Sequence, residues 1–121
     1  MFIVIQEHLA DTSVAQTQEL TPTELASMQA SATGAASLLR SISHPMRLMI
    51  LCNLAGTSKS VSELCAAVNL PQAQMSQQLA RLRQDMLVKT KKSGTKRLYS
   101  ITDPKTEKLV LLLHDLYCAQ N

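Results

Sequence analysis

Three cysteines, Cys52, Cys65 and Cys118, carry the most reactive side chains of this sequence. A cysteine thiolate is a nucleophile and a metal ligand, and it exchanges with disulfides. An odd number of cysteines argues against the disulfide framework of a secreted protein. We therefore expect a cytoplasmic chain, because in a reducing compartment a pair of cysteines is more often reactive than structural.

The three thiols differ in their expected surroundings. Cys65 falls on the apolar face of a predicted helix, where a cysteine usually serves as a small hydrophobic residue. Cys52 also falls on an apolar face, and taken alone it has the same interpretation. Cys118 lies close to the end of the sequence, where a packing residue contributes little. The residues alone leave two alternatives open, a reactive Cys52–Cys118 pair and three packing side chains.

A second group of residues suits contacts with nucleic acid. All twelve Lys and Arg residues and five of the nine acids lie in residues 40–121, and residues 81–97 hold seven Lys and Arg against one Asp. Clustered positive charge is typical of phosphate-binding surfaces, although a charge run is also often just a solvated face. Only three aromatic residues are present, which argues against an aromatic platform for single strands.

The polar face of one predicted helix, residues 72–84, could contact bases. Gln pairs with adenine edges and Arg with guanine edges in the major groove of DNA. The alternative is an ordinary solvated helix surface. The candidate DNA contacts are Gln74, Ser76, Gln77, Gln78 and Arg81 near bases, and Lys92, Lys96 and Arg97 near phosphates.

Apolar spacing predicts the helices that carry these groups. A stripe with spacings of three and four predicts a first helix from Thr23 to Ile42, with Thr21 or Thr23 as its cap. A short and mostly buried second helix is expected to start at Pro45 and to end at Gly56. The residues expected to make this helix mostly buried are Leu48, Met49, Leu51, Cys52 and Leu54.

A capping box, Ser60 with Glu63, predicts the start of a third helix. The fourth helix follows Pro71, and its predicted inward residues are Met75, Leu79, Leu82 and Met86. Residues 87–92 and 96–101 are expected to form two strands around a turn at 93–95. Asp103 and Pro104 predict the start of the last helix.

The order α-α-α-α-β-β-α is that of a winged helix-turn-helix, a mainly α fold with a two-stranded hairpin as its wing. We expect a mobile tail at residues 1–20 and one winged-helix domain, for DNA binding and dimerisation, at residues 21–121. No apolar segment is long enough to span a membrane. The short apolar start has no basic flank and does not resemble a signal peptide.

The stripe of the first helix has two interpretations. It either packs on its own domain or also pairs with a second copy of the chain. In the second case the interface residues are Leu25, Met28, Ala32, Ala35 and Leu39, with Leu112 and Leu116 of the last helix.

Several motifs together resemble the ArsR/SmtB family of dimeric bacterial repressors. They are residues 38–52 (LLRSISHPMRLMILC), 60–64 (SVSEL), 75–83 (MSQQLARLR), 87–88 (LV) and 97–101 (RLYSI). The resemblance covers roughly residues 24–118. It implies a non-enzymatic regulator that binds inverted-repeat double-stranded DNA as a homodimer, with an interface made by the first and last helices. Pro71 and Gln78 depart from the pattern, since relatives usually carry Ser or Thr and His there, so an operator preference cannot be transferred.

The positions of Cys52 and Cys118 resemble the sulfur-responsive branch of this family. In that branch the corresponding cysteines form the sensor, which implies a reversible dithiol switch that answers sulfane sulfur or another thiol oxidant. No cofactor and no metal are expected.

The main alternative is a metal- or metalloid-responsive repressor. The usual thiolate site near Cys65 needs a second cysteine, but Ala67 stands there, and Glu107, His114 and Asp115 make a sparse ligand set. A small thiol enzyme using His114 lacks a nucleophile-elbow context. A winged helix that binds only proteins is the third alternative.

Overall fold

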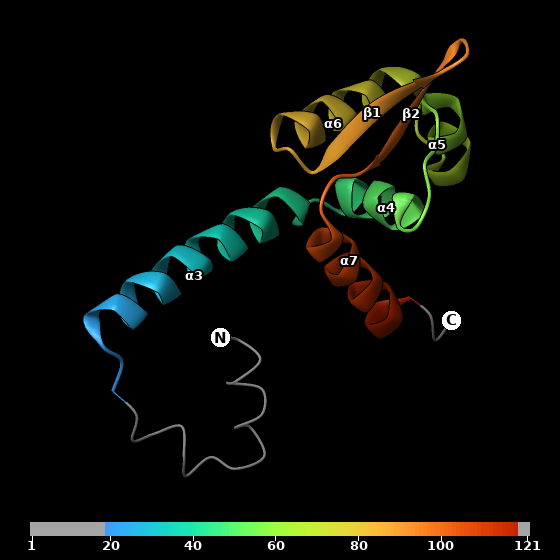
Figure 1. Cartoon of the computed structure of the whole chain (residues 1–121). Coiled ribbons are helices and arrows are strands. Elements are labelled where there is room, and N and C mark those ends of the chain that lie inside the picture. Colours follow the sequence, from blue (N-terminus) through green and yellow to red (C-terminus); the bar gives the residue numbers. More distant parts are fainter. Residues whose placement is uncertain (1–18, 119–121) are drawn as a thin grey trace. The chain divides into compact units, whose positions relative to one another are not determined.

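The computed structural model describes residues 19–118, in which the elements follow the predicted order (Figure 1). The predicted tail at residues 1–20 lies almost wholly outside the described residues and stays a prediction. The described part divides between Ser37 and Leu38 into two compact units. Its five helices and one hairpin are α3 (Pro22–Ile42), α4 (Pro45–Leu54), α5 (Val61–Val68), α6 (Gln72–Gln84), β1 (Val88–Ser93), β2 (Lys96–Ile101) and α7 (Pro104–Tyr117).

The first unit contains most of α3. Thr21 caps this helix, because its Oγ1 accepts a hydrogen bond from the Glu24 amide (3.1 Å) and its own amide donates to Glu24 Oε1 (3.0 Å). This reciprocal arrangement satisfies two amides that a helix start leaves without partners. Of the two predicted caps, Thr21 is the one that the structure uses.

The starts of α4 and α5 confirm two further predictions. Pro45 is the first residue of α4, and the His44 side chain caps it by accepting a hydrogen bond from the Met46 amide (3.1 Å). Ser60 and Glu63 form the predicted capping box of α5. The helix α4 ends at Leu54, two residues before the predicted end.

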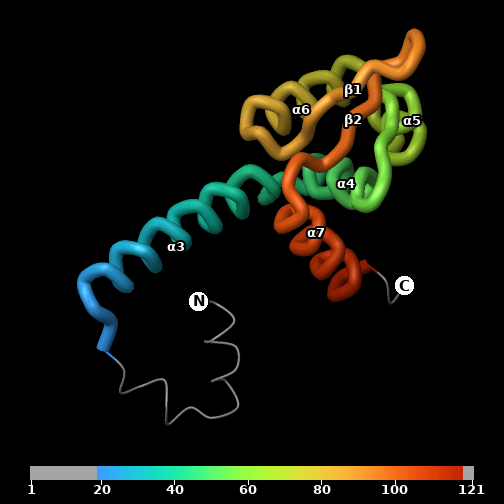
Figure 2. The backbone as a smooth tube through the Cα atoms, in the orientation of Figure 1, coloured from blue at the N-terminus to red at the C-terminus, as the bar shows by residue number. Residues whose placement is uncertain are grey.

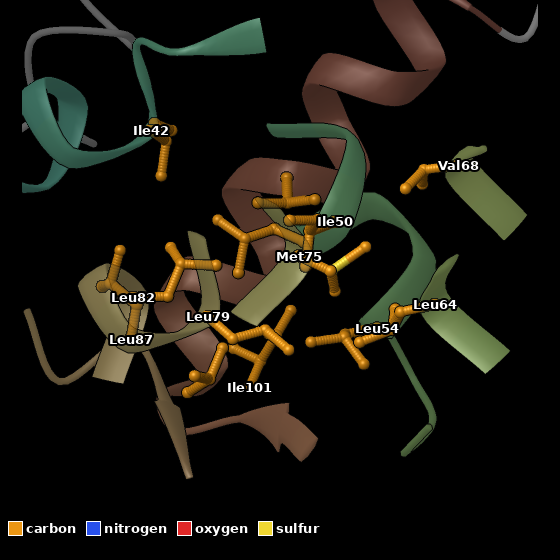
Figure 3. Packing of buried hydrophobic residues seen from close by; sticks show 13 residues of the cluster. Ile42, Ile50, Leu54, Leu64, Val68, Met75, Leu79, Leu82, Leu87 and Ile101 are labelled. Carbon is orange, nitrogen blue, oxygen red and sulfur yellow. The ribbon is translucent and has the colours of Figure 1, made fainter. Parts of the chain in front are cut away.

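The core of the second unit fills the space between α4, α5, α6 and the base of the hairpin (Figure 3). Its fully buried side chains are Ile50, Leu51, Leu54, Leu64, Met75, Leu79, Leu82 and Val110. Val110 brings α7 into the same core, so one apolar cluster fixes both helices of the helix-turn-helix and the last helix.

The hairpin β1–β2 forms the wing, and Figure 2 shows its turn extending beyond the helices of this unit. Val88 pairs with Ile101 at its base and Ser93 with Lys96 at its tip. Tyr99 also pairs with Lys59, through backbone hydrogen bonds of 2.8 and 3.0 Å, which ties β2 to the segment before α5. The first strand begins one residue later than predicted.

Two apolar residues were placed wrongly in the core by helical spacing. Met86 is 76% exposed, because α6 ends at Gln84 and the backbone at Met86 turns into the left-handed region with φ of 62°. Met49 is 44% exposed although its neighbours Ile50 and Leu51 are fully buried. The helix α4, predicted to be mostly buried, therefore has one open face.

Candidate nucleic-acid interface and thiol pair

The helix α6 presents the predicted polar face to solvent. Four of the candidate contacts with bases, Gln74, Ser76, Gln77 and Arg81, are exposed, and Gln78 is half-buried. Pro71 directly precedes the first residue of α6, and no side chain caps this end of the helix. This is the structural consequence of having proline where the resembling family usually has a capping Ser or Thr.

Arg81 does not stand alone on this face. Its Nε donates to Asp85 Oδ2 at 3.2 Å, and the Ser41 hydroxyl donates to the same carboxylate oxygen at 2.8 Å. The Ser41 hydrogen bond is the largest influence that lowers the pKa of Asp85, and the Arg81 and Arg47 charges add to it against the opposing effect of burial. Asp85 is therefore ionised at neutral pH and joins the end of α6 to the last turn of α3.

Gln78 is held from the other side. Arg47, in the first turn of α4, donates from Nη1 to Gln78 Oε1 at 3.3 Å and from Nε to the Ser41 carbonyl at 2.6 Å. Gln78 is thus linked to Ser41 through Arg47, and Arg81 is linked to Ser41 through Asp85. We call this cluster of Ser41, Arg47 and Asp85 the support cluster.

Sequence reasoning missed the support cluster. Ser41 and Asp85 lie 44 residues apart in the sequence, so no local pattern predicts their hydrogen bond. One signal was present, because Arg81 and Asp85 are four residues apart on a helix, a spacing at which opposite charges meet.

The wing carries the predicted basic residues at its exposed tip. Lys92, Lys96 and Arg97 are all exposed, and Arg97 Nη1 donates to Thr90 Oγ1 at 3.4 Å. Since Lys92 pairs with Arg97 across the hairpin, their side chains share one face, and that of Lys96 lies on the other. Hydrogen bonds from Ser60 lower the pKa of Glu63, and the Lys96 and Lys59 charges lower it further, so Lys96 lies near α5.

The thiols of Cys52 and Cys118 come from two elements that pack together, α4 and α7. Cys52 is half-buried in α4, and Cys118 is exposed directly after the end of α7. Burial raises the pKa of the Cys52 thiol, and the neighbouring Cys118 raises it further.

Cys65 is separate from this pair. It is half-buried on α5 and packs against the core, as predicted for a small apolar side chain. All three cysteines are free thiols.

Several of the residues predicted for a dimer interface are exposed apolar side chains. In the first unit Leu25 is 46% exposed, and in the second Leu39, Leu112 and Leu116 are 51%, 53% and 57% exposed. Met28 and Ala35 are half-buried, and Ala32 is exposed.

Two features are absent from the part of the chain that the structure describes. Within residues 19–118, no three His, Cys, Asp or Glu side chains gather in a way that could hold a metal ion, so Glu107, His114 and Asp115 do not form such a group. None of the helices in this range has the length and apolar character needed to cross a membrane.

Comparison with known proteins gives consistent matches. Residues 44–90 match a family described as bacterial regulatory protein, arsR family. The HTH-type transcriptional regulator YgaV of Escherichia coli is 41% identical over 97 residues, which cover 79% of this chain and 98% of YgaV. The transcriptional activator HlyU of Vibrio cholerae is 37% identical over 100 residues, which cover 83% of this chain and 93% of HlyU.

A solved structure supports the same placement. The transcriptional repressor BigR of Xylella fastidiosa superposes with a TM-score of 0.71 at 37% identity, over 78% of this chain and 96% of BigR. The winged helix-turn-helix fold predicted from the sequence is thereby confirmed.

Proposed function

We propose that this chain, a DNA-binding transcriptional regulator that belongs to the arsR family of bacterial regulatory proteins, is switched by reversible oxidation of Cys52 and Cys118. The observation that carries the proposal is that the elements holding these two thiols pack against each other. Cys52 lies on α4 and Cys118 directly follows α7. Burial raises the pKa of the Cys52 thiol, and Cys118 raises it further. A regulator of transcription acts where bacterial DNA lies, so the proposal includes a cytoplasmic location.

The proposed DNA contacts are the polar face of α6 and the tip of the wing. A helix of this kind fits the major groove, where its side chains meet base edges. The Lys and Arg side chains of a wing then meet the phosphates beside that groove. The exposure of Gln74, Gln77 and Arg81 and the positive tip of the hairpin support this arrangement.

The chemistry of the switch starts at the more accessible sulfur. The Cys118 thiolate attacks the outer sulfur of a persulfide RSSH, which gives a Cys118 persulfide and the thiol RSH. The Cys52 thiolate then attacks Cys118 Sγ, so a Cys52–Cys118 disulfide forms and hydrogen sulfide leaves. The two cysteines lose two electrons and two protons, which RSH and hydrogen sulfide carry away.

A bridge with additional sulfur follows when both cysteines are persulfidated first. One persulfide then displaces hydrogen sulfide from the other, and one extra sulfur stays in the link. A direct disulfide needs Cα atoms about 4.4–6.8 Å apart, and a longer bridge tolerates a wider gap. Such tolerance would let the pair answer persulfides while it resists mild oxidants.

The bridge acts on DNA binding through α4. This helix carries Cys52 and also Arg47, whose side chain donates a hydrogen bond to Gln78 on the polar face of α6. A covalent link to α7 that disfavours the DNA-competent geometry by about 3 kcal/mol lowers affinity roughly a hundredfold.

The proposal includes a homodimer. Exposed leucines on α7 and on α3 support pairing with a second copy, and two copies would place two α6 helices on an inverted-repeat DNA site.

Serine substitutions test the switch. Cys52→Ser and Cys118→Ser should each bind DNA like the reduced wild type and should no longer be released by a persulfide, as measured by fluorescence anisotropy with a labelled duplex. Cys65→Ser is the matched control and should respond normally. Release that persists in the Cys52→Ser, Cys118→Ser double variant would overturn the assignment.

A further inference from the structure

We propose that Ser41, Arg47 and Asp85 are positioning residues that fix which atoms of Gln78 and Arg81 face DNA, and thereby select bases rich in hydrogen-bond acceptors, guanine above all. This inference rests on the proposed DNA contacts of α6. It goes beyond them because it assigns a base preference and names the residues that set it.

The orientation of Gln78 follows from the chemistry of Arg47. A guanidinium has donors only, so the amide atom that faces it must be the oxygen. Gln78 Oε1 therefore accepts from Arg47 Nη1 at 3.3 Å, and the amide nitrogen lies at the other end of the group. Adenine recognition by glutamine uses both ends of the amide at once. With its oxygen turned toward α4, Gln78 offers DNA a donor rather than that pair.

The orientation of Arg81 follows from Asp85. Asp85 Oδ2 accepts a hydrogen bond from Arg81 Nε at 3.2 Å, which leaves the two terminal nitrogens of Arg81 for another partner. Two donors side by side match O6 and N7 of guanine in the major groove. Asp85 thus turns Arg81 into an end-on reader of guanine.

Ser41 makes the two orientations depend on each other. Its hydroxyl donates to Asp85 at 2.8 Å, and its carbonyl accepts from Arg47 at 2.6 Å. Ser41 is itself buried, with 8% of its surface exposed, so both hydrogen bonds are partly shielded from water, whereas the Arg81–Asp85 pair is exposed. Partly shielded hydrogen bonds to charged groups hold Asp85 and Arg47 more firmly than exposed pairs would.

As a result, Gln78 and Arg81 both present hydrogen-bond donors on the polar face of α6. Guanine offers two acceptors in the major groove and thymine one, whereas cytosine offers only a donor there. We therefore expect a G·C base pair at the position that Arg81 reaches, and no bidentate preference for adenine at the position that Gln78 reaches.

The test uses the reduced full-length protein and a pool of duplexes with a randomised central region. After selection, binding to the best duplex and to each single-base replacement is titrated for the wild type and the variants. Arg81→Ala should abolish the preference at one base, which identifies the base that Arg81 reaches. Gln78→Ala identifies its own base in the same way.

Substitutions in the support cluster should then change preference without abolishing binding. Asp85→Asn keeps the size of the side chain but removes the charge, and should lower discrimination for guanine at the Arg81 base at least about fivefold. Its binding to unselected DNA should stay equal or rise, because one negative charge near the phosphates is gone. A purely structural role would weaken both kinds of binding together.

Rescue and control variants sharpen the result. Ser41→Ala removes the hydroxyl that holds Asp85 but keeps the backbone carbonyl that holds Arg47, so it should reduce discrimination at the Arg81 base and leave the Gln78 base unchanged. Ser41→Thr should restore discrimination at the Arg81 base, since threonine keeps the hydroxyl. Glu107→Gln, which also removes one carboxylate but lies outside the cluster in α7, should leave every preference unchanged. Ser41→Ala carries the test if Asp85→Asn does not fold, as judged by thermal unfolding.

Two outcomes overturn the inference. One is an unchanged guanine preference in folded Asp85→Asn and Ser41→Ala, and the other is an A·T base pair selected at the position that Arg81 reaches. Failure of the proposed switch looks different, because DNA binding would then be selective but insensitive to persulfide.

Discussion

Cys52 and Cys118 differ most in their access to solvent. Cys118 is exposed, whereas Cys52 is half-buried and its thiol has a raised pKa, chiefly from burial. Because the thiolate is the reactive form, a raised pKa lowers the reactive fraction of Cys52 at neutral pH. Attack on an oxidant is therefore expected to begin at Cys118, with Cys52 closing the bridge.

Alkylation with iodoacetamide measures this order directly. At pH 7.5 Cys118 should react faster than Cys52, and the rate at Cys52 should still be rising above pH 8.5, near which an ordinary cysteine is half ionised. Cys118→Ser should speed alkylation of Cys52, because one contribution to the raised pKa of Cys52 is removed while burial remains. Mass spectrometry of the peptides gives both rates. Equal rates in the wild type would contradict the proposed order.

Single residues were predictable where their role depends on local spacing. The caps Thr21 and Ser60 and the buried Met75, Leu79 and Leu82 follow from short patterns, and the structure confirms them. The bond from Ser41 to Asp85 depends on how two distant segments pack, which no local pattern encodes. The proposed contacts with DNA and the switch stay predictions, since they involve partners outside the chain.

The wing is the element whose role depends most on charge. Its tip places Lys92 and Arg97 on one face and Lys96 on the other, with Lys96 near Glu63. A hairpin charged on both faces reaches phosphates on either side of it, while a neighbouring carboxylate offsets part of the Lys96 charge. We therefore expect Lys96 to contribute less than Lys92 or Arg97.

Replacing all three residues by alanine should weaken binding to every duplex alike. Each lost phosphate contact should flatten the dependence of log affinity on log salt concentration by about 0.9. Titrations at several salt concentrations give the slope. The double variant Lys105→Ala, Lys108→Ala removes two charges from α7 and is the control, for which the slope should change little. An unchanged slope in the triple variant would refute the role of the wing.

Elements were predictable from the sequence to within two residues at their ends. Proline and capping residues marked the starts of α4, α5 and α7. The end of α4 was placed two residues too late, at Gly56 instead of Leu54. The end of α6 was placed correctly, but apolar spacing assigned Met86 to its inward face although the chain has already turned there. A periodic pattern shows which residues would share a face, but it does not show where the helix stops.

At the scale of the whole molecule, exposed apolar side chains are the feature that one copy leaves unexplained. Leu112, Leu116 and Tyr117 on α7 are each more than half exposed. Contiguous apolar surface of this kind marks protein interfaces. A second copy is the proposed partner, because a two-fold interface would bury the same leucines from both chains.

Leu39→Glu tests that assembly. In a two-fold interface the substitution adds a carboxylate from each copy to an apolar contact, and the cost of removing both charges from water should exceed what the contact contributes. Sedimentation velocity should show a wild-type dimer at micromolar concentration and a monomeric variant, and the variant should lose affinity for an inverted repeat because it cannot engage both half-sites together. Ser37→Glu adds the same charge to an exposed position on the opposite face of α3 and should remain dimeric. A wild type that sediments as a monomer under these conditions would rule out the proposed dimer, and a dimeric Leu39→Glu would place the interface elsewhere.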